Sequence, residues 1–103
     1  SGWQTASVDA WTPIKKGREM SRWLEQGIVL AYMPGHIMLY LGERQGRPYA
    51  LSAISEYLRP CADGHDVVRL DRVVVTDFEL GAGTERTDYL SRLTALTVFG
   101  ALP

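Results

Sequence analysis

The segment around residues 34–54 constrains the fold of this chain more than any other feature. Pro34-Gly35 indicates a turn, and the apolar run His36–Leu41 that follows is the strongest strand candidate in the sequence. The polar stretch Glu43–Arg47 then separates this run from a second extended segment at 48–54. Proline is accepted at the first position of a strand, so Pro48 does not oppose this interpretation. The pattern therefore predicts an antiparallel β-hairpin.

Other parts of the chain extend the same plan. We expect further strands at Ile28–Tyr32, Val67–Phe78 and Ala95–Phe99, and short helices at Arg18–Gln26 and from Thr84, as N-cap, to about Arg92. Residues 1–16 are expected to be irregular, with Pro13 and Gly17 as breakers of regular structure. Residues 61–66 are expected to form a loop, whereas 55–60 stay undecided. An antiparallel β-sheet with peripheral helices is an α+β fold, and 103 residues are enough for a single domain.

Composition excludes several classes of function. The net charge is −1 and the eleven basic residues are scattered, so we expect neither nucleic acid nor an anionic membrane as a partner. No apolar run reaches the length of a membrane span, and the first residues lack the pattern of a signal peptide. A single cysteine, Cys61, excludes an internal disulfide.

His36 is the residue in this chain that most favours chemistry. Alternation along a strand places His36, Met38 and Tyr40 on one face. If a three-residue loop sets Gly42 opposite Gly46, then Ser52 lies directly across from His36 and its hydroxyl could orient the imidazole. A loop of another length would move Ser52 off this pairing or reverse its face. Taken alone, a histidine at the start of a strand is more often structural, so both roles stay open.

The remaining candidate sites are weaker. Cys61 and His65 have a spacing that metal sites use, but zinc requires four ligands, or three and a water, and the chain has only two histidines and one cysteine. Cys61 follows Pro60 in an expected loop, with no helix start to lower the pKa of its thiol, so we expect it to be incidental. We therefore expect no metal and no cofactor.

The stretch Met33–Gly42 resembles the histidine motif of NlpC/P60 cysteine peptidases, in which the catalytic residue opens a strand of the form His-x-x-x-Tyr-x-Gly. It resembles in particular the cell-envelope members that carry SH3-like domains. Further stretches resemble later segments of that subgroup in the same order, namely Gly46–Leu51, Arg72–Asp77 with Leu80-Gly81, Leu90–Thr94, and Val98–Gly100. Together these stretches cover nearly all of residues 27–100.

The resemblance implies that residues 1–103 form the C-terminal half of a papain-like catalytic domain. The implied reaction is hydrolysis of peptidoglycan stem peptides at the γ-D-glutamyl-diamino-acid bond, in the bacterial periplasm or outside the cell. His36 would stabilise a cysteine thiolate and protonate the leaving amine. Relatives usually place a third polar residue, commonly histidine, where Ser52 stands. Ser52 can accept a hydrogen bond but carries no charge, so it should support catalysis less well.

The family's nucleophile is the cysteine of an Asp-Cys-Ser-type motif, and no cysteine precedes His36 here. Ser1-Gly2-Trp3-Gln4 resembles the Ser-x-x-Gln that follows the nucleophile helix, so we expect the chain to begin partway through the domain. It should then be inactive alone and need an N-terminal fragment that carries the cysteine. Without that fragment, Met38 and Tyr40 should lie uncovered, and the chain should not persist as a monomer.

Two other interpretations stay open. One is a degenerate NlpC/P60 domain that binds peptidoglycan or a protein partner without cleaving it. The other is an unrelated β-rich interaction module.

Overall fold

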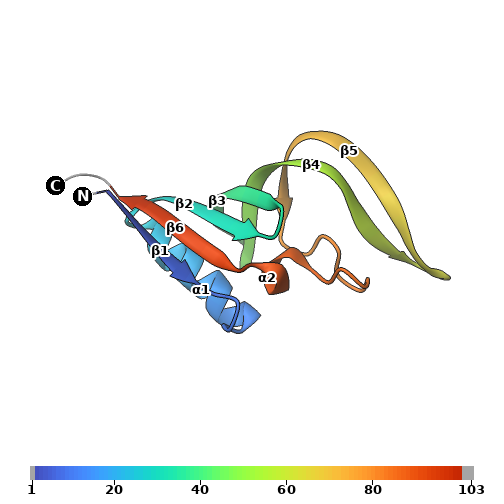
Figure 1. Cartoon of the computed structure of the whole chain (residues 1–103), viewed down its shortest axis with the longest axis horizontal. Helices are drawn as coiled ribbons and strands as arrows, with labels where there is room; N and C mark the ends of the chain where they lie inside the picture. Colours follow the sequence, from blue (N-terminus) through green and yellow to red (C-terminus); the bar gives the residue numbers. More distant parts are fainter. Residues whose placement is uncertain (1, 101–103) are drawn as a thin grey trace.

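A computed structural model describes residues 2–100 as a six-stranded antiparallel sheet in the order β1-β6-β2-β3-β4-β5, with two helices. The elements are β1 (Trp3–Ser7), α1 (Pro13–Leu24), β2 (Gly27–Met33), β3 (His36–Arg44), β4 (Arg47–Cys61), β5 (Gly64–Asp77), α2 (Tyr89–Arg92) and β6 (Ala95–Gly100). Figure 1 shows α1 along one face of the sheet. The expected α+β class is confirmed. Within residues 2–100, no helix is long and apolar enough to cross a membrane.

Helix α1 begins five residues before the start that the sequence predicted. Thr12 caps it by accepting a hydrogen bond from the Lys15 backbone N–H at 3.2 Å, and Pro13 takes the first-turn position that proline favours. Gly17, interpreted as a breaker, lies inside the helix. A glycine there costs about 1 kcal/mol relative to alanine, which the burial of Met20 and Trp23 on the same face offsets.

Residues 3–7 were expected to be irregular, but they form the edge strand β1. All five of its residues pair with β6, from Trp3 opposite Phe99 to Ser7 opposite Ala95. This pairing joins segments about ninety residues apart. Local sequence carries little signal for such a strand, because its hydrogen-bond partner supplies much of its stability.

Strands β4 and β5 form a long hairpin that extends well beyond the rest of the sheet (Figure 1). The loop expected at 61–66 is wrong, because Cys61 pairs with Gly64 across a tight turn. The undecided residues 55–60 belong to β4. These residues pair with β5 on one side only, because β3 begins at His36 and does not extend alongside them. Proline has no backbone N–H to donate, and it is tolerated at Pro60 because no strand lies on that outer side to accept a hydrogen bond.

The helix expected from Thr84 is also wrong. The hydroxyl of Thr84 donates a hydrogen bond to the Gly81 carbonyl at 2.6 Å, and the chain continues in turns. The short helix α2 begins only after Asp88, whose carboxylate caps it by accepting a hydrogen bond from the Ser91 N–H at 2.9 Å. Thr87 has a left-handed backbone, φ 60°, which breaks any continuous helix across this segment.

The core lies between α1 and the sheet, on the face that carries Met38 and Tyr40. Each of these side chains is only 2% exposed, so the expectation that they lie uncovered is wrong. The argument that this uncovered face prevents the chain from persisting as a monomer is wrong with it. Helix α1 covers them, and the Tyr40 hydroxyl shares a 2.7 Å hydrogen bond with Ser21. Several exposed apolar side chains of the sheet lie instead on the opposite face, namely Ile28, Ile37, Leu41, Val75 and Phe99.

Candidate functional site

His36 and Ser52 meet in the middle of the sheet. His36 is the first residue of β3, Ser52 lies in the neighbouring strand β4, and the distance from His36 Nε2 to Ser52 Oγ is 3.2 Å. Ser52 is only 6% exposed and belongs to the face that packs on α1. The prediction that the two side chains share a face of adjacent antiparallel strands is confirmed.

The register that joins them differs from the one predicted. The hairpin closes with a two-residue turn, Gln45-Gly46, whose φ angles of 54° and 79° are those of a type I′ turn. If the pairing register set by this turn continued unchanged along the two strands, Ser52 would lie opposite Leu39, on the face of the sheet away from the His36 side chain. A β-bulge between Tyr40 and Gly42 shifts the register by one residue. Ser52 therefore returns to the face of His36, diagonally across from it.

The imidazole of His36 is partly enclosed. Its ring lies 5.6 Å from the Tyr89 ring, at an angle of 58°. Burial, and to a smaller extent the charge of Arg92, lower the pKa of His36 below its ordinary value of 6.5. The ring is therefore neutral at pH 7. With Nε2 on Ser52, Nδ1 has no hydrogen-bond partner among residues 2–100 and is free to exchange a proton.

A cavity of about 270 Å³ lies beside the ring. Polar groups from β4 and α2 contribute to its lining, chiefly Ser55, Glu56 and Arg92. Glu56 is paired with Arg69 at 3.4 Å and with Arg86 at 3.6 Å. Glu56, Tyr89 and Arg92 were not predicted as site residues from the sequence. Arg92 lies within the stretch Leu90–Thr94 that resembles the family, but nothing in the sequence marks any of the three as a site residue, because they reach His36 only through the folding of the chain.

Cys61 is exposed at the far end of the β4–β5 hairpin. It lies nine residues along β4 from Ser52, which corresponds to roughly 30 Å at about 3.3 Å per residue in an extended strand. The thiol therefore cannot act on a substrate held by His36. The other histidine, His65, has its Nε2 3.8 Å from the Glu85 Oε1. Residues 2–100 contain no cluster of three or more side chains suited to hold a metal ion.

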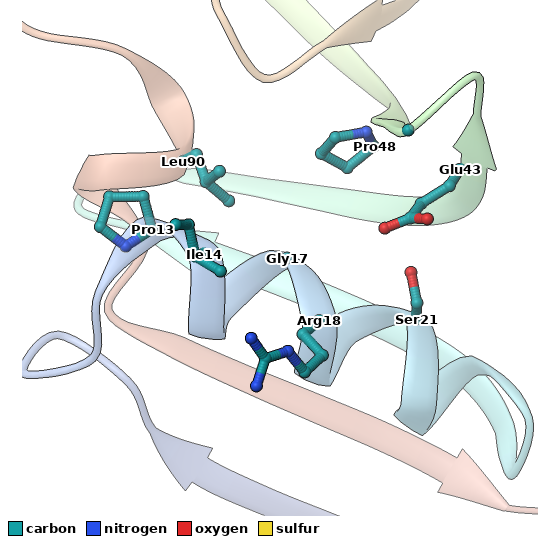
Figure 2. A pocket seen from close by; sticks show the side chains of 9 residues that line it. Pro13, Ile14, Gly17, Arg18, Ser21, Glu43, Pro48 and Leu90 are labelled. Carbon is teal, nitrogen blue, oxygen red and sulfur yellow. The ribbon is translucent and has the colours of Figure 1, made fainter.

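A second concavity, of about 530 Å³, lies between α1 and the turn that joins β3 to β4 (Figure 2). Its lining is largely apolar and includes Ile14, Gly17, Pro48 and Leu90. Ile14 is 74% exposed, and the missing side chain of Gly17 leaves the middle of α1 open, since a Cβ there would meet nothing within 4 Å. We call this concavity the α1 groove. Leu90 follows Tyr89, so α2 contributes side chains to the lining of both the groove and the His36 cavity.

Comparison of the sequence with protein-family models gives no match, and comparison with curated proteins gives no significant match.

Proposed function

We propose that this chain is the histidine-bearing part of a bacterial cell-wall cysteine peptidase, a papain-like half-domain of the NlpC/P60 type. The observation that carries the proposal is the 3.2 Å contact between His36 Nε2 and Ser52 Oγ, with Nδ1 unpartnered among the described residues. Catalytic cysteine–histidine pairs need such an arrangement, in which one ring nitrogen is held by a polar group and the other exchanges a proton with the thiol.

In the proposed reaction, Nδ1 of His36 takes the proton of a cysteine thiol. The thiolate attacks the carbonyl carbon of a γ-D-glutamyl amide, and the imidazolium returns the proton to the leaving amine nitrogen. Water then hydrolyses the thioester and regenerates the thiol. The lowered pKa of His36 supports the first step, because it keeps the ring in its neutral, proton-accepting form at pH 7.

The thiol must come from outside residues 1–103, since Cys61 is the chain's one cysteine and lies at the far hairpin. We propose an N-terminal fragment of the same domain as its source, docked in the α1 groove. An apolar segment would bury Ile14 and Leu90 there, and it would end beside α2, against which His36 rests. Peptidoglycan substrates imply a periplasmic or extracellular location.

The test joins residues 1–103 to the encoded sequence that directly precedes them, if that sequence carries an Asp-Cys-Ser-type motif. We expect hydrolysis of L-alanyl-γ-D-glutamyl-diaminopimelate by the joined protein and none by residues 1–103 alone. His36→Ala should abolish turnover, whereas the matched control Cys61→Ser should leave it unchanged. Ser52→His, which restores a group able to carry charge, should raise kcat. Turnover by residues 1–103 alone, or its loss in Cys61→Ser, would contradict the proposal.

A degenerate domain that binds stem peptides without cleaving them is the second candidate. The absence of a cysteine near His36 within residues 2–100, together with the neutral Ser52, favours it. An intact gene that lacks the Asp-Cys-Ser motif, combined with stem-peptide binding and no turnover, would support this candidate over the first.

A further inference from the structure

We propose that the outer face of the sheet is a self-association surface on which a second copy of this chain docks. The outer face is the side of the sheet turned away from α1, and its exposed apolar side chains come from β1, β2, β3, β5 and β6. The proposal does not depend on the peptidase activity. His36 and the α1 groove belong to the other side of the sheet and stay open in such a dimer.

A cross-strand row of large apolar side chains crosses four strands of the outer face. Trp3 lies opposite Phe99, and Phe99 lies opposite Ile28. The register of β2 with β3 places Leu41 beside Ile28. All four side chains are exposed, from 43% at Phe99 to 68% at Trp3. The row therefore forms a continuous apolar strip from the β1 edge to the middle of the sheet.

Two further rows extend this strip into a patch. In the next row, Leu39 lies opposite Leu51 and Leu51 opposite Val75, which is 57% exposed. The row beyond it contains Ile37, 51% exposed, and Val73, 64% exposed. None of the three rows contains a charged residue. The outer face is thus apolar from one edge of the sheet to the other.

The size of the patch matches what a stable dimer needs. Given the exposed fractions of these side chains, they leave roughly 600 Å² of apolar surface in water. The largest apolar patch of a monomeric protein is typically about 300–600 Å². An interface of standard size takes about 800 Å² from each partner, and about 65% of a homodimer interface is apolar, which corresponds to about 500 Å².

Charged groups are confined to the rim of the outer face. At one end lie Arg44 and Arg47, and Arg47 is paired with Asp77 at 3.4 Å. At the other end Asp71 is paired with Arg69 at 3.2 Å. An uncharged centre inside a charged rim is the usual composition of a protein interface. Two copies of this face can meet without opposing like charges, whereas an acidic or basic partner would find no complementary charge in the centre.

The outer face also has a shape that fits a second copy of itself. Trp3 protrudes from the edge strand β1, and a hollow of about 520 Å³ toward the other edge is lined in part by Leu41, Tyr49 and Val75. Strands β1 and β5 are the two edges of the sheet, so a two-fold axis parallel to the strands lays β1 of one copy over β5 of the other. Such an axis keeps each row in place, and Trp3 of each copy enters the hollow of its partner. The two sheets then pack about 10 Å apart, as in a β-sandwich.

Sedimentation equilibrium of the 103-residue chain tests the association. We expect the mass to rise with concentration from that of one chain to that of two, with a Kd of about 1–100 µM. Ile28→Glu should weaken the dimer by about 30-fold or more, because it places an unpaired carboxylate in the interface. Val67→Glu on the distal hairpin and Ile14→Glu in the α1 groove are matched controls at exposed apolar positions, and both should dimerise like the wild type.

A pair of complementary variants tests the two-fold arrangement. Trp3→Lys and Val75→Glu should each be largely monomeric alone, because each breaks the contact at both ends of the dimer. An equimolar mixture should form a mixed dimer, since the lysine of one copy then meets the glutamate of the other and an unchanged Trp3–Val75 contact remains at the other end. Circular dichroism will verify that every variant is folded.

A mass of one chain up to about 500 µM, or a dimer that Ile28→Glu leaves intact, would overturn the proposal. A mixture of Trp3→Lys and Val75→Glu that associates no better than either variant would overturn the two-fold arrangement. The chain joined to its encoded preceding sequence provides a further measurement. If that protein is a monomer whose outer-face amides have become protected from hydrogen exchange, the face is covered by a segment outside residues 1–103, and the proposal is likewise overturned.

Discussion

Replacing Gly42 by alanine should test whether the bulge in β3 holds His36 and Ser52 together. Gly42 has φ 120°, well beyond the left-handed region near 57° that residues with a side chain can enter. It lies where the register shifts, and that shift turns Ser52 onto the face of His36. An alanine here must either carry the strained backbone or abolish the bulge.

The cost follows from the local geometry. A Cβ on Gly42 would lie 3.4 Å from Leu24 Cδ2, a contact that a small movement of a side chain relieves, so most of the penalty lies in the backbone. Backbone in such a sparsely populated region costs of order 1–3 kcal/mol. For a domain of this size, that lowers Tm by roughly 4–8 °C for each kcal/mol. Gly46→Asn is the matched control, because φ 79° lies near the region that asparagine tolerates.

Two measurements separate the outcomes. Thermal unfolding followed by circular dichroism should show a lower Tm for Gly42→Ala and a change of less than about 4 °C for Gly46→Asn, corresponding to less than about 1 kcal/mol. NMR should show whether the cross-strand contact of Leu39 with Leu51 persists and whether the His36 ring signals change. A Gly42→Ala variant as stable as wild type, with that register and the His36–Ser52 pair intact, would refute the reasoning.

Two further predictions follow from buried polar groups. Because its folded-state pKa is lowered, His36 binds a proton less readily in the folded chain than in the unfolded one. The contribution of the neutral His36 ring to the free energy of unfolding should therefore be fully present above pH 6.5 and be lost as the pH drops through the folded-state pKa. Urea titrations should show that the free energy of unfolding falls less between pH 7.5 and pH 5.0 for His36→Gln than for the wild type. The buried hydroxyl of Thr76 has no hydrogen-bond partner among the described residues, so Thr76→Val should raise the free energy of unfolding by about 1 kcal/mol. A destabilised Thr76→Val would show that Thr76 has a partner in solution.

The sequence alone determined which residues share a face within one strand. Alternation placed Met38 and Tyr40 with His36, and both are buried on that face. The start of α1 at Thr12-Pro13 was also within reach of sequence reasoning, and Gly17 misled it. Such features depend on hydrogen bonds and side-chain directions over a few residues, so local sequence carries them.

Tertiary structure alone decided how the strands meet and what lies around His36. The bulge that turns Ser52 toward His36 depends on the fit of two strands, and one residue of shift reverses every face beyond it. Tyr89 and Arg92 reach the imidazole from more than fifty residues away, and Lys16 holds their helix by two carbonyls. α1 likewise covers Tyr40 through packing between elements. These contacts are set by the closure of the whole sheet and its helices, a property that no short segment of the chain possesses.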